Sequence, residues 1–178
     1  VTTLKDVTQY AVDSSVNTAS NSNAVITLNP STSVTSQSIT SNGYWDEFTL
    51  GSHTAIAYVN QGASFNSNGG SLTLSGPGGF YINGSYSGLY ATVNSTSSID
   101  ATLTAYSNIQ NSGKITVTGN SAYATINGSG SDTIVGSFNS LNLSISSGSV
   151  YAEINHYSYN VLNGSIINNG GNVNITDD

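Results

Sequence analysis

The chain has 178 residues, which is enough for one domain with its own hydrophobic core. Only 6% of the residues are charged, against about 25% in an ordinary soluble protein. Two lysines, no arginine and a formal net charge of −7 argue against nucleic-acid binding, which needs a surface of cations. Cysteine is absent, so no disulfide contributes, and no apolar run approaches the roughly 18 residues of a membrane-spanning helix.

The N-terminal part of the chain is a mildly apolar segment followed by a linker rich in Ser, Asn and Thr. Leu4, Val7 and Ala11 fall at helical spacing, whereas Tyr10 and Val12 alternate as in a strand, so both conformations stay open. A tethered apolar segment can enter a neighbouring domain that lacks a strand, although it can equally fold onto its own domain. We expect a tail at residues 1–22 and a separate domain at residues 23–178. The candidate donor-strand contacts are Val1, Leu4, Val7, Tyr10 and Val12.

From residue 23 onwards, apolar and polar residues alternate in many short runs, such as 55–59, 99–105 and 141–145. Turn sequences rich in Gly and Asn separate these runs. The pattern predicts an all-β fold, namely an Ig-like or pilin-like β-sandwich of many short antiparallel strands with an N-terminal extension. A β-helix is the less favoured alternative, because a solenoid needs a fixed repeat and the Asn-Gly-Ser turns recur at uneven intervals.

Six Asn-x-Ser/Thr sequons occur, a number close to chance for a chain so rich in Asn, Ser and Thr. Three of them are Asn-Gly-Ser, a turn sequence that is usually exposed. The chain begins at Val1, and we expect that a secretory signal has been removed. In a secreted chain, N-linked glycans are expected at Asn83, Asn94, Asn127, Asn142, Asn163 and Asn174.

The sequence offers little to catalysis or metal binding. His53 and His156 are the only histidines and lie far apart in the chain, so we expect surface or hydrogen-bonded side chains rather than zinc ligands. Asp46 and Glu47 are adjacent on an expected strand and therefore point to opposite sides. No nucleophile motif accompanies the many serines. We predict no catalytic, metal or cofactor-binding residue, and a protein that is not an enzyme.

Tyrosines and one lysine give two further hypotheses. Tyrosines can form a platform for sugars, although they are also ordinary strand residues. Lys114 is expected to be a solvent-facing charge at a sheet edge rather than part of an isopeptide bond. The two clusters of tyrosines in the sequence are Tyr81, Tyr86 and Tyr90, and Tyr151, Tyr157 and Tyr159.

A chain rich in Ser, Thr, Asn and Tyr, nearly free of Lys and Arg, without Cys, and with sequons and an N-terminal extension resembles the thread filament subunits of thermoacidophilic archaea. Archaeal bundling pilins are a close second. The resemblance implies a head domain similar to bacterial type 1 pilins, a tail that enters the next subunit as a donor strand, and N-glycosylation. The function it implies is that of an extracellular surface filament, a head-to-tail homopolymer with a role in adhesion or biofilm. The alternative is a monomeric carbohydrate-binding or adhesin β-module.

Overall fold

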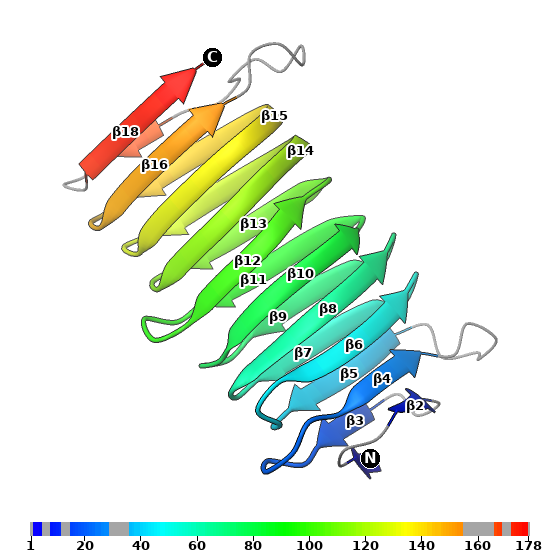
Figure 1. The fold of residues 1–178 in the computed structure, drawn as a ribbon. Coiled ribbons are helices and arrows are strands. Elements are labelled where there is room, and N and C mark those ends of the chain that lie inside the picture. Colours follow the sequence, from blue (N-terminus) through cyan, green and yellow to red (C-terminus); the bar gives the residue numbers. More distant parts are fainter. Residues whose placement is uncertain are drawn as a thin grey trace.

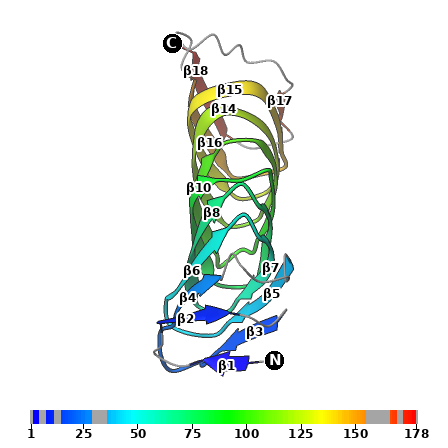
Figure 2. The ribbon, with the colours of Figure 1, turned by 90° about the vertical axis from the view of Figure 1, so that its right-hand side faces the viewer.

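The computed structural model of the protein describes residues 2–4, 8–11, 15–28, 36–154, 166–168 and 172–177. The regular elements of these residues are all strands, and they coil into a parallel β-solenoid (Figure 1). The two ends of the chain lie at opposite ends of the column (Figure 2). No helix of the described residues is long and apolar enough to cross a membrane.

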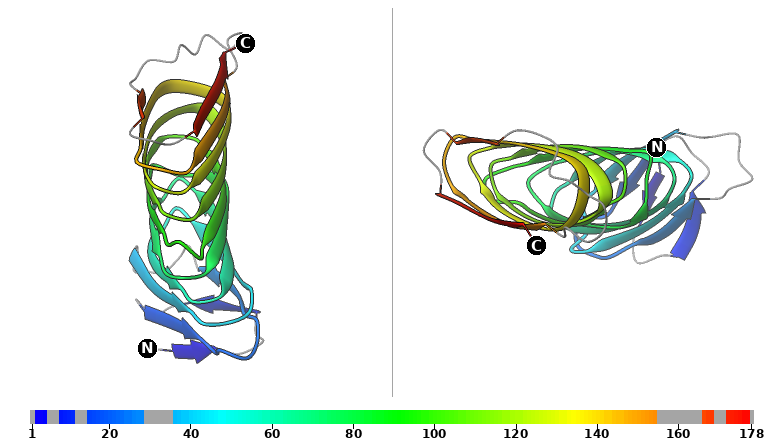
Figure 3. Two further views of the ribbon diagram at one scale, coloured as in Figure 1. Left: turned by 90° about the vertical axis from the view of Figure 1, so that its left-hand side faces the viewer. Right: turned by 90° about the horizontal axis from the view of Figure 1, so that it is seen from above.

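Two parallel sheets, which we name face A and face B, form the opposite sides of the column (Figure 3). Face A consists of β2 (Thr8–Ala11), β4 (Val25–Leu28), β6 (Asp46–Gly51), β8 (Gly62–Asn68), β10 (Gly79–Ser85), β12 (Ser98–Leu103), the first parts of β14 (Lys114–Gly128) and β15 (Ser131–Ile145), β16 (Ser149–Ile154) and β18 (Asn172–Asp177). Face B consists of β1 (Thr2–Leu4), β3 (Ser15–Thr18), β5 (Ser36–Ser41), β7 (Thr54–Val59), β9 (Ser71–Ser75), β11 (Gly88–Val93), β13 (Tyr106–Asn111), the second parts of β14 and β15, and β17 (Ile166–Asn168).

The predicted antiparallel β-sandwich, and with it the pilin-like head domain, is wrong, because every ladder between described strands is parallel. The fold is a β-helix, the alternative that the sequence pattern favoured less. Its repeat is carried by stacked strand positions, and its length varies. Gly62 with Gly79 and Tyr106 with Tyr123 are separated by the same length of chain, whereas Phe80 and its partner Ile99 are further apart. The Asn-Gly-Ser turns do not follow this repeat, since β10 ends on face A just after Asn83, whereas β14 ends on face B just after Asn127.

The core lies between the two faces and is built from rows of apolar side chains stacked from turn to turn. The predicted alternation is confirmed in β7, where Ala55, Ala57 and Val59 are buried while Ile56 and Tyr58 are exposed. On face A, the rings of Phe48 and Phe65 occupy paired positions and stack with their centroids 5.3 Å apart. Each inward row therefore needs one apolar residue per turn, which the alternating sequence supplies.

The N-terminal segment belongs to the solenoid in the structure. β1 and β2 pair in parallel with β3 and β4 of the same chain, and residues 15–18 of the expected linker form β3. Of the candidate donor-strand residues, Leu4 lies in β1 and Tyr10 in β2, whereas Val1, Val7 and Val12 fall outside the described residues. The insertion of this segment into a neighbouring subunit stays a prediction.

A buried carboxylate ties the early turns together. Asp46 is fully buried and accepts hydrogen bonds from the hydroxyls of Thr18 at 2.5 Å and Ser41 at 2.6 Å. It also accepts from the backbone N–H groups of Ala24 at 2.9 Å and Gly43 at 3.1 Å. Since the next residue, Glu47, is exposed, the expectation that these two carboxylates point to opposite sides is confirmed.

Replacement of Asp46 by Ala should strongly destabilise the protein, because the donors of Thr18, Ala24 and Ser41 lose this acceptor and the Gly43 N–H keeps only the Thr18 hydroxyl. We expect a loss of at least about 3 kcal/mol in the free energy of unfolding, measured by urea denaturation. The matched control is Glu47→Ala at the exposed neighbour, which should change stability by less than about 0.5 kcal/mol. Equal losses in the two variants would contradict the role of Asp46.

A second inward carboxylate, on face A, sits in apolar surroundings. Asp132 pairs in register with Ile115 on one side and Val150 on the other, and its side chain is buried. It accepts a hydrogen bond of 2.7 Å from the amide Nδ2 of Asn111. Burial raises the pKa of Asp132 from 3.8 to about 6, and the Asn111 hydrogen bond lowers it only in part.

Because folding raises the pKa of Asp132, we expect its protonation in acid to increase the free energy of unfolding. The folded chain holds this proton more tightly than the unfolded chain, so the stabilisation is complete below pH 3.8 and is lost as pH rises through about 6. Urea denaturation at a series of pH values between 4 and 7 should show this fall in the natural chain. Asp132→Asn should remove that component of the pH dependence, and an identical profile in both proteins would refute the assignment.

Candidate functional site: a groove lined by tyrosines

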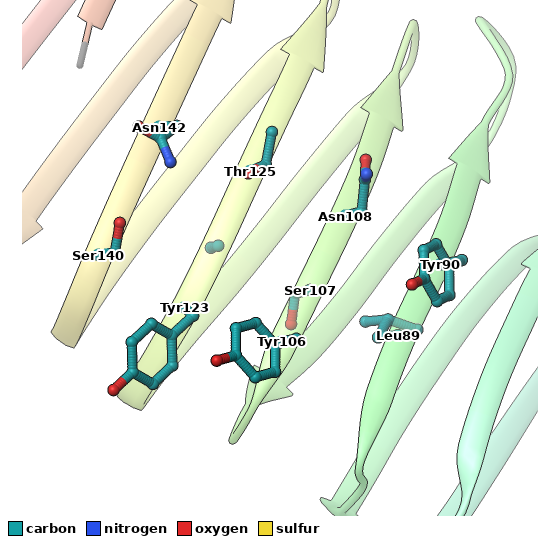
Figure 4. A pocket seen from close by; sticks show the side chains of 10 residues that line it. Leu89, Tyr90, Tyr106, Ser107, Asn108, Tyr123, Thr125, Ser140 and Asn142 are labelled. Carbon is teal, nitrogen blue, oxygen red and sulfur yellow. The ribbon is translucent and has the colours of Figure 1, made fainter. Parts of the chain in front are cut away.

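A groove in the described part of the molecule lies on face B (Figure 4). It has a volume of about 310 Å³ and crosses β11, β13 and the second parts of β14 and β15. Its walls carry three exposed tyrosines from consecutive turns, Tyr90 on β11, Tyr106 on β13 and Tyr123 on β14. The groove therefore follows the solenoid axis and crosses the strands.

The tyrosine rings remain open to solvent. Tyr106 and Tyr123 occupy paired positions and stack, with ring centroids 5.0 Å apart and an angle of 26° between the planes. Tyr106 is 68% exposed, Tyr90 58% and Tyr123 41%. Tyr90 pairs with Asn108, so it lies two positions further along its strand than the stacked pair. Such exposed rings offer apolar faces, each with a hydroxyl at the rim.

A row of polar side chains runs beside the tyrosines. Asn108, Thr125 and Asn142 pair in register on three successive strands (Figure 4). Because neighbouring strands lie about 4.8 Å apart, this row presents amide and hydroxyl groups at a regular spacing. Such a row suits a ligand that itself carries polar groups at regular intervals.

A second hollow on face B continues the groove past Tyr90. It has a volume of about 470 Å³ and shares Tyr90 and Asn108 with the first groove. Its other outward-facing residues include Thr73, Thr92 and Gln110. The exposed ring of Tyr90 thus separates two parts of one polar and aromatic surface.

The side chains that line the groove are uncharged. They include no Asp, Glu, Lys, Arg or His. No cluster of metal-binding side chains occurs among the residues that the structure describes. Hydroxyls, amides and aromatic rings are the groups available to a ligand.

The sequons occupy different environments. The side chains of Asn83 and Asn94 are exposed, and those of Asn127 and Asn142 are half-buried. Asn174 lies in β18 on face A, and Asn163 falls outside the described residues. Because Asn142 lines the tyrosine groove, a glycan attached to it would occupy the same space as a ligand. Glycosylation of all six sites stays a prediction.

The tyrosine clusters expected from the sequence are not the ones that the fold brings together. Tyr81 is exposed on face A and Tyr90 on face B, while the buried Tyr86 hydroxyl lies 2.6 Å from the Ser107 hydroxyl. Tyr151 is exposed on face A, and Tyr157 and Tyr159 fall outside the described residues. The signal that could have found the groove is the nearly regular spacing of Tyr90, Tyr106 and Tyr123 in the sequence.

His53 and Lys114 lie in different environments, the first buried and the second exposed. His53 is buried and its ring Nδ1 lies 3.0 Å from the backbone oxygen of Leu50, as expected for a hydrogen-bonded histidine. His156 falls outside the described residues. Lys114 is exposed, but its strand pairs on both sides, at Ser98 and Ser131, so the prediction of a sheet edge is wrong.

Comparisons with protein-family models, with curated proteins and with solved structures gave no match to this chain. The resemblance to archaeal filament subunits thus stays a prediction from composition.

Proposed function

We propose that the protein is a binding module for neutral glycan chains, which lie in the tyrosine groove of face B. The observation that carries the proposal is a set of three exposed tyrosines on consecutive turns. Tyr106 and Tyr123 stack on each other, and Tyr90 continues the in-register row of two amides and a hydroxyl beside them. The adhesin-like module, weighed as an alternative from the sequence, is thereby our preferred function.

The two kinds of group in the groove match the two surfaces of a pyranose ring. A pyranose has an apolar face of C–H groups, which packs on aromatic rings such as those of Tyr106 and Tyr123. Its rim carries hydroxyls, which both donate and accept hydrogen bonds, as do the side chains of Asn108 and Thr125. The absence of charge in the lining favours a neutral sugar over an anionic one.

The direction of the groove indicates how a chain of sugars would lie. The rings of Tyr106 and Tyr123 lie on consecutive turns with their centroids 5.0 Å apart, and Tyr90 lies on the turn before them, two positions further along its strand. A single sugar covers one or two of these turns. We therefore expect an extended oligosaccharide to run across the strands and to bind more tightly as it becomes longer.

That the protein forms a homopolymer, lies outside the cell and has no enzymatic activity stays a prediction. The donor-strand joint has no described contact to support it, because β1 and β2 pair within their own chain. A glycan-binding surface serves adhesion in a filament and in a monomer alike.

Binding should be measured by isothermal titration of unglycosylated protein with neutral hexasaccharides of glucose, N-acetylglucosamine, mannose and xylose. At least one should bind, and Tyr106→Ala or Tyr123→Ala should weaken that binding by about three- to tenfold through loss of ring contacts. Shortening the ligand to a disaccharide should also weaken it.

The matched control is Tyr151→Ala, which removes from the opposite face a tyrosine whose exposure is similar to that of Tyr123. It should leave the affinity unchanged. No binding by any hexasaccharide, or equal losses from Tyr106→Ala and Tyr151→Ala, would overturn the proposal.

A further inference from the structure

Face A carries a second groove, which is built around the only tryptophan of the chain. It has a volume of about 380 Å³, and its outward-facing side chains include Trp45, Tyr81, Asp100, Lys114 and Thr116. Trp45 directly precedes β6, and the other four come from β10, β12 and β14. The parallel register thus gathers residues that are far apart in the sequence.

A backbone hydrogen bond and a neighbouring glycine accommodate Trp45. The backbone N–H of Trp45 donates a hydrogen bond of 2.9 Å to Oδ1 of Asn23. The indole covers Gly62, where an added Cβ would lie 2.5 Å from the ring carbon Cε3, so only glycine leaves room for it. Since Gly79 pairs with Gly62 on the next turn, the floor of the groove beside the ring is also bare. Trp45 is still 42% exposed, which leaves part of the indole available to a ligand.

Two opposite charges face this groove. Asp100 pairs with Tyr81 and Thr116, and Lys114 lies on the strand next to Asp100 at the position paired with Ser98. Lys114 is the only lysine or arginine among the described residues. No hydrogen bond or ion pair involves the side chain of Asp100 or Lys114 in that part of the chain. Both charges are therefore available to a ligand, whereas the groove of face B has no charged side chain.

We propose that this groove is a second binding site, and that its ligand is a pyranose that carries a carboxylate. The Trp45 and Tyr81 rings pack on the C–H face of the sugar. The Lys114 ammonium pairs with the carboxylate, and Asp100 accepts hydrogen bonds from sugar hydroxyls. A neutral sugar leaves Lys114 unused, whereas a phosphate would bring a larger negative charge next to Asp100.

This site rests on residues of the face opposite the tyrosine groove and stands independently of it. Occupied together, the two sites let one molecule hold a neutral chain on face B and an acidic chain on face A. Two separate contacts to a mixed polysaccharide matrix raise the overall avidity beyond that of either site.

The test is isothermal titration of the full chain with tetrasaccharides of galacturonate, mannuronate and guluronate, each beside its uncharged methyl ester. At least one acid should bind more tightly than its ester by about fivefold, the upper range for an exposed ion pair. Lys114→Gln should reduce the affinity for that acid to the level of its ester and leave the ester unchanged. Trp45→Ala should weaken both.

Two controls separate this site from other effects. Lys5→Gln removes the other lysine of the chain, and Tyr106→Ala disables the groove on face B; both should leave binding of the acid intact. The proposal is overturned if no acid binds, if acid and ester bind equally, or if Lys114→Gln and Lys5→Gln have the same effect. If only Tyr106→Ala weakened binding of the acid, the acid would bind on face B, and the proposal would also be overturned.

Discussion

The structure depends on one constraint, the in-register parallel pairing of each turn with the next. Strands of successive turns lie about 4.8 Å apart, so most residues in the inner strands have a paired residue on the turn before and on the turn after. Inward positions then form rows such as Phe48, Phe65 and Ile82, where a polar residue costs stability unless it is satisfied. Asp46 is satisfied by four hydrogen-bond donors. Asp132 has one, the Asn111 amide, and burial raises its pKa.

The same register arranges the outward positions, where it forms the two grooves that we propose as binding sites. On face B it stacks Tyr106 on Tyr123 and aligns Asn108 with Thr125, which gives an uncharged groove along the axis. On face A it brings Lys114 next to Asp100, near the only tryptophan. Both faces are parallel sheets, and their different outward side chains are the basis for the two classes of sugar that we propose.

Alternation in the sequence was sufficient to predict an all-β chain and many of its buried residues, including those of β7 and β9. It could not distinguish antiparallel from parallel strands. In either kind of sheet, a strand with one buried face and one solvated face has the same alternating sequence. The repeat was hidden because its length varies, since the turn from Ser98 to its partner Lys114 is shorter than the turn from Lys114 to Ser131. Without the repeat, residues one turn apart could not be recognised as neighbours, and both grooves were missed.

The register can be tested directly, because the chain has no cysteine of its own. Asn108 and Thr125 are paired on adjacent strands of face B, whereas Thr133 lies on face A. A double variant Asn108→Cys with Thr125→Cys should be bridged rapidly and almost completely by a short bifunctional thiol reagent. The control pair, Asn108→Cys with Thr133→Cys, should stay unbridged within the monomer. Equal bridging of the two pairs, or bridging of the control pair alone, would contradict the parallel solenoid and both grooves.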